Sequence, residues 1–185
     1  MRLTQNGERC LTVSPRGAKC VRLGWKLAPV NKMVNEVPNA PIFNSVYRHG
    51  VDEKRRIQIP SMWREKDSKV QFTLIVWPQR SEGPCLRVLP PKEMTELMAS
   101  LDAMPNEDRN KTILKRIIGA ESTQVALDGA GRICVPDEMA KAANIKSEAV
   151  LVGLLDRFEI WDPVRYEKVK AADAVLAQEA FKLME

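Results

Sequence analysis

The chain has 185 residues, 44% of them hydrophobic, which suits one globular core or two small cores that share a surface. Its longest apolar run, residues 149–155, is too short to cross a bilayer, so we expect no membrane partner. The formal net charge of +5 is uneven: basic residues outnumber acidic ones in residues 1–40 and 41–120, whereas acidic residues prevail in 121–185. A basic first half predicts that a polyanion would bind there.

The cysteines and the histidine argue against a metal site. Cys10, Cys20, Cys85 and Cys134 form no C-x-x-C pair, and His49 is the single histidine. A tetrahedral zinc site needs more ligands or closer ones. We therefore expect isolated thiols in a reducing cytoplasm, with no metal and no cofactor.

An N-terminal extension, residues 1–42, differs from the rest of the chain. It is basic, rich in Gly, Pro and Cys, and has no sustained period of 2 or 3.6 residues. It has no apolar h-region either, so no signal peptide is expected. We interpret it as a disordered basic tail, or as the result of a start codon assigned too early, with Met33 the true first residue. An ordered extra strand is the alternative.

The segment that follows predicts short strands. Period-2 alternation of bulky residues predicts strands at 45–51, 56–59, 69–76 and 85–89. Pro60 ends the second of these, because proline cannot donate a ladder hydrogen bond. Ser61 is expected to cap a short helix that runs through Glu65.

Two helices are predicted in the middle of the chain. Pro90-Pro91 begins the first, and the second follows Pro105 and ends at Gly119. Apolar residues recur at helical spacing in both. They are Met94, Leu97, Met98, Leu101, Ile113, Leu114, Ile117 and Ile118. Such stripes indicate a core or a subunit contact rather than a cofactor site.

The last third repeats the order of elements found in the first. Strands are expected at 121–127, 132–135, 149–155 and 158–161, with a short helix at 137–143. A final helix begins at Pro163 with Asp162 as its N-cap, and can continue to about Met184.

A nine-residue frame occurs twice in register. Residues 52–60 read Asp-Glu-Lys-Arg-Arg-Ile-Gln-Ile-Pro, and residues 128–136 read Asp-Gly-Ala-Gly-Arg-Ile-Cys-Val-Pro. In each, Asp precedes Arg by four positions and the Arg opens an Ile-x-aliphatic-Pro strand. We interpret this as an internal duplication. The predicted units are a first repeat at 45–92, a helical linker at 93–120, a second repeat at 121–166 and a C-terminal helix at 167–185.

The frame has the chemistry of a tight turn. Asp52 and Asp128 can accept backbone N–H bonds two residues on, and Gly129 and Gly131 can supply positive φ. Arg55 stands where the second copy has Gly131. If that position needs positive φ, either Arg55 is strained or the first turn is of another type.

Each frame then places an arginine just after the turn, at the tip of a hairpin. Arg56 and Arg132 are expected to point into solvent, each oriented by its Asp. A salt bridge that only staples the hairpin is one reading. The other is that the guanidinium groups bind phosphates and base edges. Lys54 and Arg55 make the first tip the more cationic one, so we expect the main contact with double-stranded DNA there.

These motifs resemble the MraZ family, which is related to the AbrB and SpoVT swapped-hairpin DNA-binding domains. The similarity is closest at residues 127–132 and 150–162, includes the helix at 109–119, and extends over about 43–172. It implies an α+β fold: a tandem duplicated AbrB-like swapped-hairpin β-barrel with flanking helices.

The resemblance also implies a function and its residues. Family members form ring-like homo-oligomers that bind short direct repeats in the promoter of the division and cell-wall gene cluster, which includes their own gene. The protein would then be a nucleoid-associated regulator in the cytoplasm. The family's functional arginine corresponds to Arg56, and also to Arg132, with Lys54 as a phosphate contact.

Two other classes of function are to be considered. An antitoxin-like or structural oligomeric interaction protein is the alternative, although antitoxins of this type usually combine one hairpin unit with a disordered acidic tail. An enzyme is not expected, because the sequence has no Gly-x-Ser-x-Gly, no Walker loop and no paired carboxylates in a recognisable setting. We therefore predict no catalytic residues and no small-molecule substrate.

Overall fold

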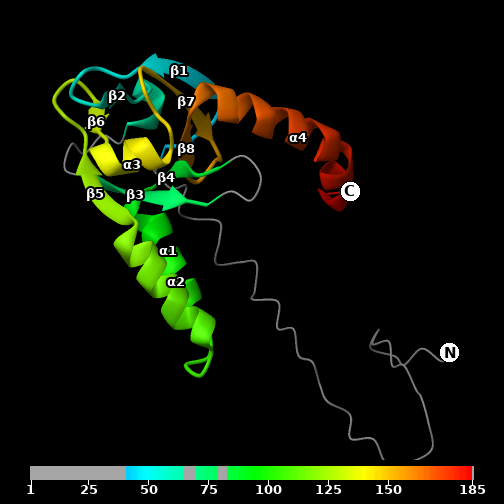
Figure 1. Ribbon diagram of the computed structural model, residues 1–185. Coiled ribbons are helices and arrows are strands. Elements are labelled where there is room, and N and C mark those ends of the chain that lie inside the picture. The colour runs from blue at the N-terminus through cyan, green and yellow to red at the C-terminus, as the bar shows by residue number, and fades with distance from the viewer. Residues whose placement is uncertain (1–40, 65–69, 79–82, 185) are drawn as a thin grey trace, which may run out of the picture. The chain divides into compact units, whose positions relative to one another are not determined.

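The structure, a computed structural model, describes residues 41–64, 70–78 and 83–184 (Figure 1). Within these ranges the chain is α+β, as expected, with four α-helices and a mainly antiparallel arrangement of strands. The predictions for residues 1–40, including those on Cys10 and Cys20, lie outside the described residues.

The strands follow the predicted order along the chain. They are β1 (Val46–Gly50), β2 (Arg56–Gln58), β3 (Gln71–Trp77), β4 (Cys85–Leu89), β5 (Ser122–Ala126), β6 (Arg132–Cys134), β7 (Glu148–Gly153) and β8 (Phe158–Trp161). The helices are α1 (Pro91–Asp102), α2 (Arg109–Ala120), α3 (Asp137–Ala142) and α4 (Pro163–Phe181), with 3-10 turns η2 (Ser61–Trp63) and η3 (Lys182–Met184).

Six strands form one sheet in the order β1-β7-β8-β4-β3-β5. All of its pairings are antiparallel, and three of them join a strand of the first half to one of the second: β1 with β7, β4 with β8 and β3 with β5. The corresponding strands of the two halves are β1 and β5, β3 and β7, and β4 and β8. Each lies as far from one edge of the sheet as its counterpart lies from the other edge. The described strands leave β1 and β5 as open edges, so this sheet does not close into the barrel that we expected.

A second, two-stranded sheet joins the two frames directly. β2 pairs with β6 in antiparallel register, with Ile57 opposite Ile133, Arg56 opposite Cys134 and Gln58 opposite Arg132. The facing isoleucines are equivalent residues of the two frames, 76 positions apart. Both are fully buried. Ile-x-aliphatic is therefore the part of each frame that anchors its turn to the core.

The main core lies between the sheets and contains residues of both halves. Trp63 of η2 is fully buried at its centre and contacts the rings of Phe43 and Phe158. Phe72 and Leu74, which alternate along β3, belong to this core. One large hydrophobic cluster thus holds both frames in place.

The helical hairpin α1–α2 packs beside the sheet and makes a second cluster (Figure 1). Its buried members are Ile75, Leu89, Leu101 and Ile118. Gly119 does not end α2 as predicted: the helix continues through Ala120, and the N–H of Glu121 still donates to the Ile117 carbonyl at 2.9 Å. Glycine permits a helix end but does not force one.

Two further predictions concern helix starts. Ser61 does not cap η2; Pro60 holds the N-cap position with φ −52° and ψ 138°, and no side chain caps this turn. The fixed φ of proline already sets the direction of the chain there. For α4 the prediction is confirmed, since the Asp162 carboxylate accepts a hydrogen bond from the Arg165 N–H at 3.0 Å and Pro163 is the first helical residue.

No residue of α4 is buried, and Figure 1 shows the helix leading away from the sheet. Its distal half exposes large apolar side chains. They are Val175, Leu176 and Phe181, followed in η3 by Leu183 and Met184. Exposed apolar side chains of this kind can mark a contact with another protein.

Candidate nucleic-acid interface

The two turns, here called the first tip (residues 52–56) and the second tip (residues 128–132), share one hydrogen-bond pattern. Asp52 Oδ1 accepts from the backbone N–H groups of Lys54 and Arg56, both at 2.9 Å. Asp128 Oδ1 accepts from Ala130 and Arg132, also at 2.9 Å. In each tip one carboxylate oxygen thus accepts two backbone N–H groups of its own turn.

The backbone conformation of the two tips also agrees. The N–H of Arg55 donates to the Asp52 carbonyl at 2.9 Å, and that of Gly131 to the Asp128 carbonyl at 2.8 Å. Arg55 has φ +57° and Gly131 has φ +77°. The first turn is therefore of the same kind as the second, and Arg55 adopts a left-handed conformation that costs energy for a residue with a Cβ. Gly129 is not among the positive-φ residues, so that prediction is wrong.

Reciprocal hydrogen bonds connect the tips. The Val135 N–H donates to the Arg55 carbonyl and the Ile59 N–H to the Gly131 carbonyl, both at 3.0 Å. Gln58 adds a side-chain bond from Nε2 to the Ala130 carbonyl at 3.0 Å. The two tips thus sit on one short β-ribbon whose inner residues are buried, which fixes their spacing.

Each tip arginine is bound to its own aspartate. Arg56 Nε lies 2.7 Å from Asp52 Oδ2. Arg132 engages Asp128 Oδ2 through Nε at 2.9 Å and Nη2 at 2.8 Å, and its Nη1 lies 4.0 Å from Asp52. The Arg56 and Arg132 side chains are only 32% and 30% exposed, so they do not extend freely into solvent as predicted. Each guanidinium group is instead oriented by a carboxylate, and part of each arginine side chain remains exposed.

The pKa values of the aspartates follow from these bonds. The Arg132 guanidinium and backbone N–H lower the pKa of Asp128 to about 2. The Arg56 backbone N–H, followed by its guanidinium, also lowers the pKa of Asp52. Hydrogen bonds to a carboxylate favour its charged form. Both aspartates are therefore ionised at neutral pH and keep the arginines oriented.

The other two predicted contacts differ from each other. The Lys54 side chain is exposed at the turn of the first tip. Arg55 instead turns to α3, where its Nε pairs with the Asp137 carboxylate and lowers the pKa of Asp137. The sequence does not predict this pair, because its members are 82 positions apart and belong to different halves of the chain.

One arginine near the second tip was not predicted. Arg64 follows η2 and donates from Nε and Nη2 to the Ile59 carbonyl at 2.9 and 2.8 Å. Its guanidinium lies directly against Gly131, where an added Cβ atom would overlap Arg64 Cζ. The sequence contains a signal for Arg64. The equivalent residue of the second half, 76 positions later, is Ala140, so the two halves differ here.

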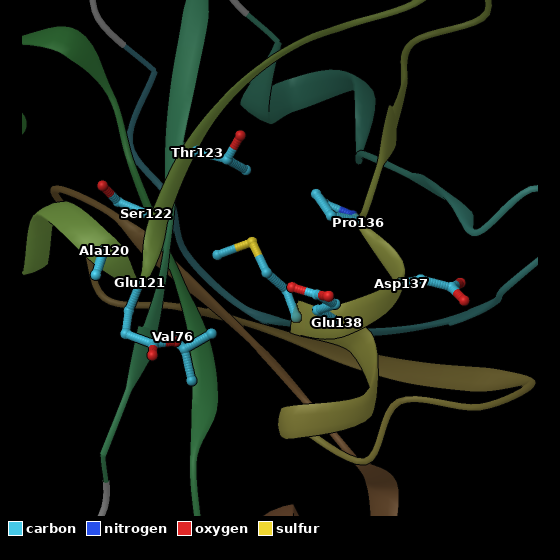
Figure 2. A pocket seen from close by; sticks show the side chains of 9 residues that line it. Val76, Ala120, Glu121, Ser122, Thr123, Pro136, Asp137 and Glu138 are labelled. Carbon is cyan, nitrogen blue, oxygen red and sulfur yellow. The ribbon is translucent and has the colours of Figure 1, made fainter. Parts of the chain in front are cut away.

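A shallow cavity of about 370 Å³ lies between the α2–β5 junction and α3 (Figure 2). Glu121, Asp137 and Glu138 are among its lining residues. An acidic lining repels phosphate, so this cavity is not part of the candidate interface. In the part of the chain that the structure describes, no three His, Cys, Asp or Glu side chains gather as metal ligands, and no helix is long and apolar enough to cross a membrane.

Known proteins resemble this chain over most of its length. A transcriptional regulator MraZ from Pseudomonas putida (strain F1) is 32% identical over 139 residues, which cover 75% of this chain and 91% of the relative. The protein of the same name from Clostridium tetani is 31% identical, covering 78% and 98% of the two chains. That from Rickettsia rickettsii is 29% identical, covering 75% and 93%.

A family model described as "MraZ protein, putative antitoxin-like" matches residues 118–182. This range contains the second tip, β7, β8 and all of α4. The curated relatives extend the similarity to about three quarters of the chain and to nearly their own full length. The chain therefore belongs to the MraZ family.

Proposed function

We propose that the protein is a transcriptional regulator that binds double-stranded DNA in a sequence-specific way through its two tips. The observation that carries the proposal is the pair of matched turns on the β2–β6 ribbon, each with an arginine held by an aspartate. The names of the relatives, transcriptional regulator MraZ, support it.

The chemistry of the tips suits a nucleic acid. An arginine guanidinium can bind a phosphate or the O6 and N7 atoms of guanine with two parallel hydrogen bonds. A guanidinium already oriented by a carboxylate loses less side-chain entropy on binding than a free one. The exposed Lys54 adds a mobile charge for the DNA backbone.

Arg56 is the better placed of the two tip arginines. Among the described residues its hydrogen bond to Asp52 uses Nε, whereas Arg132 commits Nε and Nη2 to Asp128 and brings Nη1 within 4.0 Å of Asp52. Arg56 therefore keeps more donors for an incoming base or phosphate. We assign Arg56 the main contact and Arg132 a supporting one.

We also propose that the two halves are duplicated swapped-hairpin units. The exchange of strands between halves, β1 with β7 and β5 with β3, supports this reading. So does the register of β2 and β6, in which equivalent residues of the two frames face each other. A duplicated unit would present two similar tips from one chain.

The exposed apolar surfaces favour a homo-oligomer, which we take to be ring-like. Val175, Leu176 and Phe181 of α4 are 80%, 62% and 68% exposed. On the helical hairpin, Met98 and Ile117 are 50% and 47% exposed. Exposed apolar side chains of this kind are candidates for a subunit contact. An assembly would cover them and place several pairs of tips at regular spacing.

Such an assembly fits a repeated target. We propose short direct repeats in the promoter of the division and cell-wall gene cluster, including the protein's own gene, bound in the cytoplasm at the nucleoid. A single tip makes few contacts, and attraction to phosphate alone is weak and salt-sensitive. Several linked tips on several repeats gain affinity through effective concentration.

The experiment that tests this function is a binding titration with DNA from the protein's own promoter. Fluorescence anisotropy compares the natural repeats with a duplex in which only the repeats are scrambled, at several salt concentrations. We expect binding to the natural DNA at least about 1,000-fold tighter, with a steep loss of affinity as salt rises. Equal affinity for both duplexes would exclude sequence-specific binding.

An antitoxin-like interaction is the second candidate, because the family description contains that word and α4 exposes large apolar side chains. A small toxin bound to α4 would then copurify in a fixed ratio with the natural protein. The helical state of α4 favours the oligomer instead, since antitoxins of this fold usually bind with a disordered tail.

A further inference from the structure

The two tips differ at one place, and a second difference elsewhere in the chain matches it. Position 55 is Arg, and its equivalent, 131, is Gly. Position 64 is Arg, and its equivalent, 140, is Ala. The first half thus has an arginine at both positions, and the second half has a small residue at both.

The space that the side chains occupy explains why the two halves differ at these positions. A Cβ atom built on Gly131 would overlap Arg64 Cζ, and would come within 2.5 Å of Arg64 Nη1. The guanidinium of Arg64 therefore fills the place where a side chain at position 131 would begin. In the first tip that place belongs to the side chain of Arg55, and the buried Ala140 at the position equivalent to Arg64 is small.

Arg64 is held firmly in this place. Its Nε and Nη2 donate to the Ile59 carbonyl at 2.9 and 2.8 Å, and the Ile59 N–H donates to the Gly131 carbonyl at 3.0 Å. Among the described residues, no carboxylate lies within 4.0 Å of its guanidinium. Within the part of the chain that the structure describes, the Arg64 guanidinium donates to a neutral carbonyl.

This arrangement changes the charge balance that the sequence predicts for the tips. The first tip has three basic and two acidic residues, but Asp137 of α3 adds a carboxylate that pairs with Arg55. The second tip has one basic and one acidic residue, and Arg64 adds a cation. Because Lys141 also pairs with Asp137 at 3.5 Å, the two tips carry similar charge once these neighbours are included, and Arg64 supplies the excess cation of the second tip.

We propose that Arg64 contacts the phosphate backbone of DNA at the second tip, as the counterpart of Arg55 at the first. Both tips then have a guanidinium beside the turn. In the first tip it belongs to Arg55 of the turn itself, and in the second tip it belongs to Arg64 of the first half of the chain. This inference rests on the proposed function, DNA binding through the tips, and adds a residue to it.

Two substitutions separate charge from structure at this position. Arg64→Gln keeps an N–H donor for the Ile59 carbonyl and removes the charge, whereas Arg64→Lys keeps the charge. Both are compared with the wild-type protein and with Arg56→Ala on promoter DNA over a range of salt. Circular dichroism melting shows that each variant is folded at the temperature of the titration.

We expect Arg64→Gln to lower the slope of log affinity against log salt by about 0.9 per engaged subunit, the value for one lost phosphate contact. Arg64→Lys keeps the wild-type slope. A wild-type slope for Arg64→Gln, or an equal loss in both variants, overturns the inference. In that case loss of binding by Arg56→Ala shows that the proposed function itself still holds, whereas unchanged binding by Arg56→Ala refutes both.

A double variant covers the case in which neither single variant folds. Arg64→Ala with Gly131→Arg gives the second tip the arrangement of the first, with the arginine in the turn and a small residue at the other position. A wild-type salt slope in this variant supports the inference, and a slope lowered by about 0.9 per engaged subunit contradicts it.

Discussion

Arg55 and Gly131 occupy equivalent places in the two tips and both have positive φ, +57° and +77°. The turn thus imposes a left-handed conformation whichever residue stands there. For arginine this conformation costs about 1–2 kcal/mol. The first tip keeps Arg55 in spite of that cost, which indicates that its side chain has a function beyond the turn.

The strain at Arg55 predicts an ordering of two variants. Arg55→Gly and Arg55→Ala both lose the exposed ion pair with Asp137, but only alanine keeps a Cβ at positive φ. We expect the glycine variant to be the more stable by about 1 kcal/mol in the free energy of unfolding. Urea denaturation measures the difference. Equal stability of the two variants would show that this turn is not strained.

In the second tip, adding a side chain at the equivalent position should lower the stability of the fold. Gly131→Ala places a Cβ at φ +77° and against the Arg64 guanidinium, so we expect a loss of about 2 kcal/mol or more in the free energy of unfolding. Gly129→Ala is the matched control, because a Cβ there meets no atom within 4 Å and its φ is not positive. Thermal melting of both variants checks this, and similar losses would contradict it.

The lowered pKa of Asp128 predicts how the stability of the fold depends on pH. Its folded-state pKa is about 2, below the ordinary value of 3.8. A carboxyl with a lowered pKa stabilises the fold above its unfolded-state pKa, and this contribution is lost as pH falls from 3.8 towards 2. The difference in melting temperature between wild type and Asp128→Asn should therefore shrink over that window. A constant difference would argue against the ion pair with Arg132.

The cysteines give a chemical test of the β2–β6 ribbon. Cys134 is exposed and lies opposite Arg56, whereas Cys85 is buried, and burial raises the pKa of its thiol. N-ethylmaleimide should modify Cys134 and spare Cys85 in the folded protein, as peptide mass spectrometry would show. Because the adduct stands beside Arg56, it should also weaken DNA binding. Cys134→Ser should resist that loss, and an equal loss would disprove the placement.

Local chemistry explains what the sequence predicts correctly. Each Asp-to-Arg pair lies within five residues, and the period-2 patterns of β3 and β4 are visible without knowledge of the fold. The N-cap at Asp162 follows from its neighbour Pro163 in the same way. Elements and turns of this kind depend on a few adjacent residues.

The parts that the sequence does not predict depend on distant contacts. The ion pair of Arg55 with Asp137 and the contact of Arg64 with Gly131 both cross from one half of the chain to the other. The open sheet likewise depends on which edges the strands leave unpaired, which local pattern does not specify. The frame therefore locates the tips, while the fold determines which charges surround them.

If the tips bind DNA, Arg56→Ala is the variant that should weaken binding. The matched control is Arg48→Ala, which removes an arginine that pairs with Glu167 of α4 at 2.6 Å and lies outside both tips. Anisotropy titrations on promoter DNA measure affinity, and light scattering measures the oligomer. We predict that Arg56→Ala loses at least about tenfold in affinity with its assembly unchanged, while Arg48→Ala binds as wild type does. Wild-type affinity for Arg56→Ala would contradict the account.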